Sequence, residues 1–270
     1  MSGRWLARAA PSTDAGIRLF LFPYAGGGGG LYRDWDRAFA PGTDVLPVQL
    51  PGREERFREP AISQIDQLSD VIAEALLPLC DRPFILFGWS MGARIAHAVA
   101  RRCEVAGRVP HLLVVAANSA PHLPYRRPRI HDLSGEDFWR GVANFGGAPR
   151  ELLAEPELRD LVEPMLRADF ALIETAPLAK TPSVTCPVAA ITATEDALVD
   201  ANDVAAWQEA TSGPSLLLRV SGDHFCLRDD PGSVQAAVRL ALDWAPPGVP
   251  EMAPKGLRLT LRDIGGLMEV

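Results

Sequence analysis

The chain has 270 residues, of which 47% are hydrophobic and 23% charged, values that are ordinary for a globular protein of one or two domains. A chain of this length buries enough surface to fold without disulfide or metal cross-links. Acidic residues number 34 against 27 lysines and arginines, and the resulting net charge of −7 argues against a broad surface for nucleic acid or anionic membrane.

The cysteines and the apolar runs indicate the cellular compartment in which we expect the protein. No two of the four cysteines form a C-x-x-C pair, which disfavours a metal site and favours a reducing environment. No apolar run approaches the roughly 20 residues of a membrane span, and residues 1–10 lack the continuous apolar core of a signal peptide. We therefore expect a cytoplasmic protein that binds neither nucleic acid nor membrane.

Short apolar runs alternate with amphipathic stretches along most of the chain. The runs are too short for an average helix, and they predict strands at residues 17–22, 45–50, 84–87, 112–117, 188–192 and 216–220. The stretches between them predict helices at residues 65–79, 91–103, 204–210 and 234–244. Apolar strands that alternate with helices predict a mostly parallel sheet covered by helices on both faces.

One segment breaks this alternation. Residues 134–176 carry no strand signal, and glycines and prolines separate helix-like pieces at residues 136–144, 149–153 and 156–174. We interpret them as a helical lid over the carboxyl edge of the sheet, with ordinary crossover helices as the alternative. The predicted organisation is a core of residues 1–125 and 177–245, a lid of residues 126–176 and a loosely ordered C-terminal tail of residues 246–270.

The sharpest motif is Gly88-Trp89-Ser90-Met91-Gly92, which follows one apolar run and precedes a predicted helix. A G-x-S-x-G sequence between a strand and a helix is typical of a nucleophile elbow, a sharp turn that exposes the serine hydroxyl. The residues two before and two after the serine must be small, and both are glycine. A plain glycine turn is the alternative, which the strand–turn–helix context disfavours.

A serine hydroxyl becomes a strong nucleophile only when a base accepts its proton, so each of the five histidines is a candidate. His224 is the best placed, because it follows the last predicted strand at the carboxyl edge of the sheet. His97 lies about two helical turns beyond Ser90, roughly 10 Å along the axis. The other three lie at the opposite edge of the sheet or near the predicted lid: His111, His122 and His131.

A third group must orient the imidazole and stabilise its charged form. The loop after residues 188–192 offers Asp196, just past the strand end, beside Glu195, which we expect to be solvated. Farther along, Asp200 and Asp203 are expected at a helix N-terminus, where carboxylates are favoured. The chain order serine, Asp196, histidine is that of α/β-hydrolases, so we predict an α/β-hydrolase fold with flanking helices and an inserted helical lid.

Acyl transfer places negative charge on an oxygen, which requires preorganised N–H donors. We expect one donor at the backbone of Met91, and the other at Ala25 or Gly26, in the loop after the first strand. The glycine run at residues 26–30 also suggests a phosphate loop. That pattern fails, because Leu31 stands where G-x-G-x-x-G requires glycine and no Gly-Lys-Ser/Thr follows.

With these residues identified, the sequence resembles the type II thioesterases that accompany polyketide synthases and nonribosomal peptide synthetases. The resemblance covers residues 17–244 and rests on four segments. The segment at residues 50–56 separates this family from other esterases. The segments are Phe22-Pro23-Tyr24-Ala25-Gly26-Gly27, Leu50-Pro51-Gly52-Arg53-Glu54-Glu55-Arg56, Gly88-Trp89-Ser90-Met91-Gly92-Ala93 and Gly222-Asp223-His224-Phe225.

The resemblance implies a catalytic triad of Ser90, Asp196 and His224, with oxyanion donors at Met91 and Ala25. It also implies an acyl chamber under the lid, where we expect Gly26, Trp89 and Phe225 to contact substrate. Two departures bear on the shape of that chamber. Trp89 stands where the family often has histidine, and Cys226 stands where an aromatic residue is common.

The implied activity is hydrolysis of stalled acyl groups from the phosphopantetheine arms of acyl- or peptidyl-carrier domains, through an acyl-enzyme on Ser90. The substrate would be an acyl thioester, with no metal and no cofactor, and we expect a monomer. A carboxylesterase acting on free esters is the nearer alternative, and a non-catalytic binding module the more distant one.

The implied carriers are acidic, so a local cationic face is needed for docking. Two arginine clusters are candidates, although solvated loop charge is the favoured interpretation of both, and our docking hypothesis is that the second one contacts the carrier. The clusters are Arg53, Arg56 and Arg58, and Arg126, Arg127 and Arg129.

Overall fold

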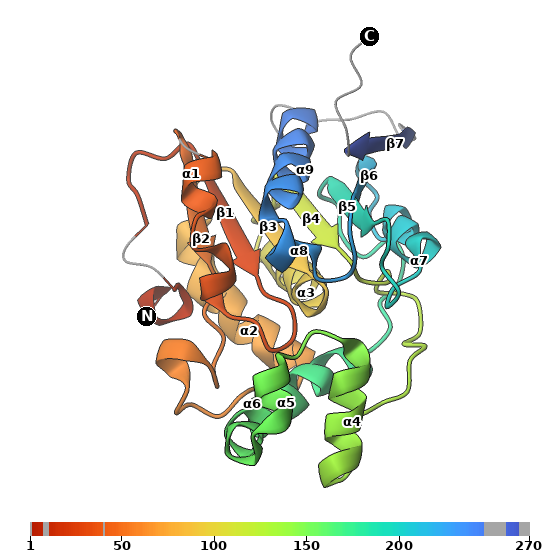
Figure 1. The fold of residues 1–270 in the computed structure, drawn as a ribbon. Coiled ribbons are helices and arrows are strands. Elements are labelled where there is room, and N and C mark those ends of the chain that lie inside the picture. The colour runs from red at the N-terminus through yellow and green to blue at the C-terminus, as the bar shows by residue number, and fades with distance from the viewer. Residues whose placement is uncertain (1, 8–10, 40, 246–257, 265–270) are drawn as a thin grey trace.

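The protein is described by a computed structural model that covers residues 2–7, 11–39, 41–245 and 258–264. Its strands form one sheet in the order β2-β1-β3-β4-β5-β6-β7, and every neighbouring pair is parallel (Figure 1). The strands are β1 (Ile17–Phe22), β2 (Thr43–Pro47), β3 (Phe84–Trp89), β4 (Leu112–Ala116), β5 (Val188–Ala193), β6 (Ser215–Val220) and β7 (Arg258–Ile264). The six predicted strands are all present.

The edge strand β7 was not predicted. It lies in the segment for which we expected loose order, and it extends the sheet beside β6. The rest of that predicted tail, residues 246–257 and 265–270, lies outside the described residues.

Helices cover both faces of the sheet, as predicted. The described α-helices are α1 (Trp35–Phe39), α2 (Ile65–Leu76), α3 (Met91–Val105), α4 (Gly135–Phe145), α5 (Arg150–Ala154), α6 (Pro156–Glu174), α7 (Ala201–Ala205), α8 (Cys226–Asp229) and α9 (Pro231–Trp244). Short 3₁₀ helices include η2 (Gly29–Tyr32), η3 (Glu54–Arg56) and η5 (Ala206–Glu209). None of the helices in the described ranges combines the length and the apolar character that crossing a membrane requires.

The sheet separates two apolar cores because successive strand residues point to opposite faces. In β3, Leu86 belongs to the core under α2 and α3, whereas Ile85 and Phe87 belong to the core under α1 and α9. Every residue of β3 is buried, which explains why the sequence of this strand is apolar without alternation.

The insertion between β4 and β5 folds as helices α4, α5 and α6, which gather at one end of the sheet (green in Figure 1). These helices have a small apolar core of their own, which includes Phe138, Trp139, Met165, Leu166 and Phe170. The segment is therefore held by its own packing as well as by contacts of α6 with α3.

One histidine is buried in the core under α3. His97 is 4% exposed, its Nε2 lies 2.8 Å from the hydroxyl of Ser183, and its ring meets Trp207 edge-on. Burial, with a smaller contribution from the positive charges of Arg101 and Arg94, lowers the pKa of His97 to about 3. The imidazole is therefore neutral in the folded protein across the physiological range.

This burial predicts a pH dependence of stability. Above pH 6.5 His97 is neutral in both the folded and the unfolded protein, so it adds no pH dependence to the free energy of unfolding. Below pH 6.5 only the unfolded chain binds the proton. The free energy of unfolding therefore falls by up to about 1.4 kcal/mol per pH unit. We expect His97→Gln to show a shallower slope than the wild type between pH 6.5 and 5 in urea unfolding. The control Ser183→Ala keeps the titrating group and should keep the slope; equal slopes in His97→Gln and wild type would contradict the prediction.

Candidate active site

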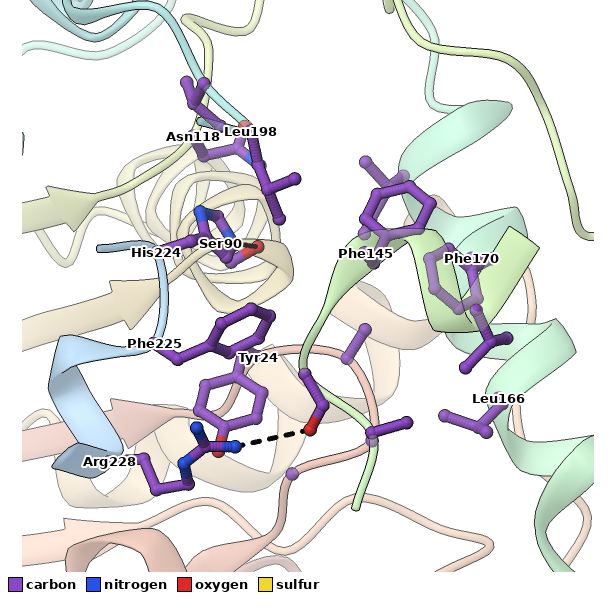
Figure 2. A pocket seen from close by; sticks show the side chains of 18 of the residues that line it. Tyr24, Ser90, Asn118, Phe145, Leu166, Phe170, Leu198, His224, Phe225 and Arg228 are labelled. Atoms are coloured by element: carbon purple, nitrogen blue, oxygen red, sulfur yellow. Dashed lines mark hydrogen bonds between the residues drawn. The ribbon is translucent and has the colours of Figure 1, made fainter. Parts of the chain in front are cut away.

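A cavity of about 540 Å³ lies between the carboxyl edge of the sheet and the lid helices (Figure 2). The sheet side contributes Ser90 and His224, with Ala25 from the loop after β1. The lid side is mainly apolar and includes Phe145, Leu152, Met165, Leu166 and Phe170. Ser90 therefore opens into a cavity whose opposite wall is apolar.

Ser90 occupies the sharp turn between β3 and α3. Its φ of 53° and ψ of −118° lie in a region that non-glycine residues rarely adopt, and its N–H donates to the carbonyl of Ala116 at 2.8 Å. A Cβ at Gly88 would lie 2.1 Å from the carbonyl oxygen of Gly92, and one at Gly92 would lie 2.1 Å from that of Phe22. Both flanking positions therefore require glycine, as an elbow does.

The structure brings the three predicted residues together. The Nε2 atom of His224 lies 2.9 Å from the hydroxyl of Ser90, and its Nδ1 lies 2.8 Å from a carboxylate oxygen of Asp196. The second carboxylate oxygen of Asp196 accepts hydrogen bonds from the N–H groups of Leu198 and Val199. The carboxylate is thereby fixed to accept from Nδ1, which leaves Nε2 free to take the serine proton.

Two of the three expected substrate contacts line the cavity, and one does not. Gly26 and Phe225 are cavity residues, and the Phe225 ring packs edge-on against His224 and Tyr24. Trp89 is fully buried in the core under α1 and α9, so the expected contact of its side chain with substrate was wrong. Its indole N–H instead donates to the backbone carbonyl of His224 at 2.9 Å, which supports the histidine from behind.

The two candidate oxyanion donors in the loop after β1 differ in their hydrogen bonds. The N–H of Gly26 donates to the Asp169 carboxylate at 2.8 Å, so it is already used, and Ala25 is the better candidate. Met91 is the first residue of α3, where backbone N–H groups have no acceptor within the helix. The positive end of the helix dipole adds to the attraction for an oxyanion at this place.

Asp169 is a residue that the sequence reasoning missed. It lies on lid helix α6, is 1% exposed, and forms a two-point ion pair with Arg53, itself 6% exposed, at 2.6 and 2.8 Å. Arg53 also donates to the carbonyl of Gly27. The pair therefore ties the lid to the two residues that directly follow Ala25. Asp169 is one of five acidic residues in α6, so nothing in the sequence distinguished it from the others.

The burial of Arg53 corrects one docking hypothesis. Arg56 is also buried, and it pairs with Glu59 at 2.7 Å while its guanidinium stacks on the Trp5 ring. Of the first cluster only Arg58 is exposed, so these three arginines do not form a cationic surface. In the second cluster Arg126 and Arg129 are exposed.

The glycine run after β1 binds a carboxylate of the chain itself. The Glu54 side chain accepts hydrogen bonds from the N–H groups of Gly29 and Gly30 at 2.9 and 3.0 Å. The N–H groups that would hold a phosphate are therefore occupied. Within the described ranges, no group of three or more His, Cys, Asp or Glu side chains is arranged to hold a metal ion.

The remaining candidates lie outside the hydrogen-bonded chain around Ser90. The carboxylate of Asp200 caps α7 by accepting from the N–H of Asn202, as expected for a helix N-terminus. His131 is held by Glu174 at 2.5 Å, and His122 lies 3.5 Å from Glu209. Each of these side chains has a structural partner of its own.

Comparisons with known proteins agree with this geometry. The sequence model of the family described as "Thioesterase domain" matches residues 17–240. The chain is 34% identical to thioesterase PikA5 of Streptomyces venezuelae, in an alignment that covers 84% of this chain and 82% of the relative. It is 35% identical to linear gramicidin dehydrogenase LgrE of Brevibacillus parabrevis, in an alignment that covers 88% of this chain and 92% of the relative. The solved structure of the type II thioesterase BorB from the borrelidin biosynthetic cluster superposes with a TM-score of 0.79 at 32% identity, covering 90% of this chain and 99% of that one.

The ion pair between the lid and the loop predicts the effect of Asp169→Asn. Loss of the carboxylate charge leaves the Arg53 guanidinium buried without compensation, which costs about 3–5 kcal/mol of unfolding free energy. Freed from its anchor, the Ala25 loop also becomes less well positioned, so kcat should fall together with stability. Urea unfolding and thioester hydrolysis measure the two effects.

The matched control is Asp160→Asn, an exposed carboxylate on the same helix. It removes the same charge without touching the loop and should change stability by less than about 0.5 kcal/mol. Equal effects of the two substitutions would show that Asp169 has no special role.

Proposed function

This chain belongs to the thioesterase domain family and is a thioesterase, and on that premise we propose that it releases stalled acyl groups from carrier-bound phosphopantetheine with Ser90 as nucleophile. The observation that carries the proposal is the hydrogen-bonded chain Ser90–His224–Asp196 at the wall of an apolar cavity. Relatives named as thioesterases of biosynthetic pathways, one of them a type II thioesterase of an NRPS/PKS pathway, support a role in such a pathway.

In the first half-reaction, the Ser90 oxygen attacks the thioester carbonyl carbon while His224 Nε2 accepts the hydroxyl proton. The N–H groups of Met91 and Ala25 donate to the oxyanion that forms. The carbon–sulfur bond then breaks, and His224 returns its proton to the pantetheine sulfur. The acyl group remains as an ester on Ser90.

In the second half-reaction, water attacks this ester while His224 again accepts a proton, and the tetrahedral intermediate collapses to release the carboxylic acid and restore the serine hydroxyl. Asp196 stabilises the imidazolium in both halves, because its carboxylate lies 2.8 Å from Nδ1. The apolar lid residues Phe145, Leu166 and Phe170 would bind the hydrocarbon part of the acyl group (Figure 2).

The assignment of Ser90 predicts the effect of its removal. Ser90→Ala should lower kcat/KM for an acylated carrier domain by three orders of magnitude or more, because both half-reactions lose the covalent path. Intact-mass analysis of the carrier measures acyl release directly. The control Ser183→Ala removes a hydroxyl outside the cavity, and activity of Ser90→Ala equal to wild type would exclude the serine as nucleophile.

The alternative function, a carboxylesterase that acts on free oxygen esters, can be tested by comparing two substrates of the wild-type protein. The substrates are an acyl-pantetheine thioester and the same molecule with oxygen in place of the sulfur, which differ only in the bond that is cleaved. Faster hydrolysis of the oxygen ester would favour the carboxylesterase.

We propose that the exposed Arg126 and Arg129, at the start of the lid segment, contact the carrier. Arg129→Glu should raise KM for the carrier-bound substrate several-fold through the lost attraction to an acidic partner, with little change for acyl-pantetheine. Arg58→Glu reverses the same charge on an exposed residue of the other cluster and serves as the control. Equal effects of Arg129→Glu on both substrates, or a larger effect of Arg58→Glu, would contradict this contact.

A further inference from the structure

Helix α3 carries a second functional group one turn beyond the nucleophile. Arg94 follows Ser90 by four residues, which places its Cα about 6 Å farther along the helix axis. Its side chain is 7% exposed and lines the same cavity as Ser90 and His224. No step of the proposed hydrolysis uses this residue.

The hydrogen-bond partners of Arg94 are neutral. Its Nε donates to the side-chain oxygen of Asn118 at 3.1 Å, and its NH1 donates to the carbonyl of Pro121 at 3.2 Å. Two of the five N–H donors of a guanidinium are used in this way. The buried Arg53, by contrast, meets the Asp169 carboxylate.

Arg94 remains charged in spite of its burial. Loss of hydration lowers its pKa to about 10, well above neutral pH, and no carboxylate among the described residues offsets that loss. A buried cation without a counter-ion is costly, and the cost falls when an anion binds beside it. The cavity therefore presents a positive charge, with N–H donors to spare, within reach of an acyl group on Ser90.

Asn118 and the phenylalanines of helices α4 and α6 lie on different sides of the cavity. Figure 2 shows Asn118, the partner of Arg94, on the Ser90 and His224 side, and Phe145 and Phe170 across from it. An acyl group that ends in hydrocarbon suits the lid side, and one that ends in a charge suits the Arg94 side.

Three carboxylates of the described residues line the cavity, and each has partners of its own that leave the charge of Arg94 uncompensated. Glu54 accepts from the N–H groups of Gly29 and Gly30. Asp203 lies 3.5 Å from Arg126 and accepts from the hydroxyl of Ser119, while Asp200 caps α7. None of the three forms an ion pair with Arg94 within the described part of the chain.

We propose that Arg94 forms an anion subsite for acyl groups that carry a terminal carboxylate, so that half-thioesters of short dicarboxylic acids, of the malonyl and succinyl type, are substrates. The inference rests on the proposed function, since it places the acyl carbonyl on Ser90. A carboxylate a few bonds from that carbonyl is matched to a guanidinium one helical turn from the serine. Charge-assisted hydrogen bonds from Arg94 to the carboxylate would hold it.

The test compares malonyl-pantetheine with acetoacetyl-pantetheine, in which a neutral methyl ketone replaces the carboxylate at nearly the same size. In Arg94→Gln, the ratio of kcat/KM for malonyl to that for acetoacetyl should fall about 10- to 100-fold relative to wild type. Arg94→Lys keeps the charge but loses the planar fork, so its ratio should fall less. An unchanged ratio in Arg94→Gln would overturn the proposal.

The matched control is Arg101→Gln, which removes the same charge from an exposed position on the same helix and should leave the ratio unchanged. Ser90→Ala separates this inference from the function on which it rests. If Ser90→Ala still hydrolyses acetoacetyl-pantetheine at the wild-type rate, the proposed function fails, whatever the ratio in the Arg94 variants.

A second measurement needs no Arg94 variant and so does not depend on how well one folds. In the wild-type protein, succinate should inhibit acetoacetyl-pantetheine hydrolysis at a concentration at least about tenfold lower than its uncharged analogue succinamide, because only the dianion meets the guanidinium. Equal inhibition by the two compounds would overturn the subsite.

Discussion

The approach of α3 to the end of β1 is the contact on which the rest of the site depends. A Cβ at position 92 would lie 2.1 Å from the Phe22 carbonyl oxygen, so only glycine permits this distance. The contact places the first N–H groups of α3 beside the loop that begins at Pro23 and carries Ala25. The same turn holds Ser90 at a positive φ. Nucleophile, helix terminus and loop thus converge because two backbones touch without side chains between them.

The lid contributes to this convergence as well as covering it. Asp169 projects from α6 and holds both the N–H of Gly26 and the guanidinium of Arg53, so the loop is fixed from the lid side while Gly92 fixes it from the sheet side. A buried ion pair adds little net stability compared with apolar packing. It does, however, fix the position of α6 relative to the loop, because the two charged groups must stay within hydrogen-bond distance. The chamber that would bind the acyl group and the loop that would stabilise its oxyanion are therefore parts of one packed unit.

The charged side chains near the cavity differ in the partners that compensate their charge. Arg53 is buried with a counter-ion, and Glu54 fills the amide cradle that the glycine run would otherwise offer to an anion. Arg94 is buried with neutral partners alone. Whether a glycine run or an arginine can bind an anion therefore depends on the acceptors that its N–H groups already have within the chain.

Local features of the sequence were enough to predict six of the seven described strands, the elbow and the positions of Asp196 and His224. Short apolar runs and the residues that follow them can be recognised without knowledge of the fold. The sequence also contained the burial of Trp89, which shares the two-residue period of Ile85 and Phe87 and so points away from the cavity. The contacts of Asp169 with Gly26 and Arg53, which lie 143 and 116 residues away in the chain, became visible only in the folded protein. The same is true of the pairing of β7 with β6. Such pairings depend on how distant segments pack, and no periodicity or motif within a segment encodes its partner.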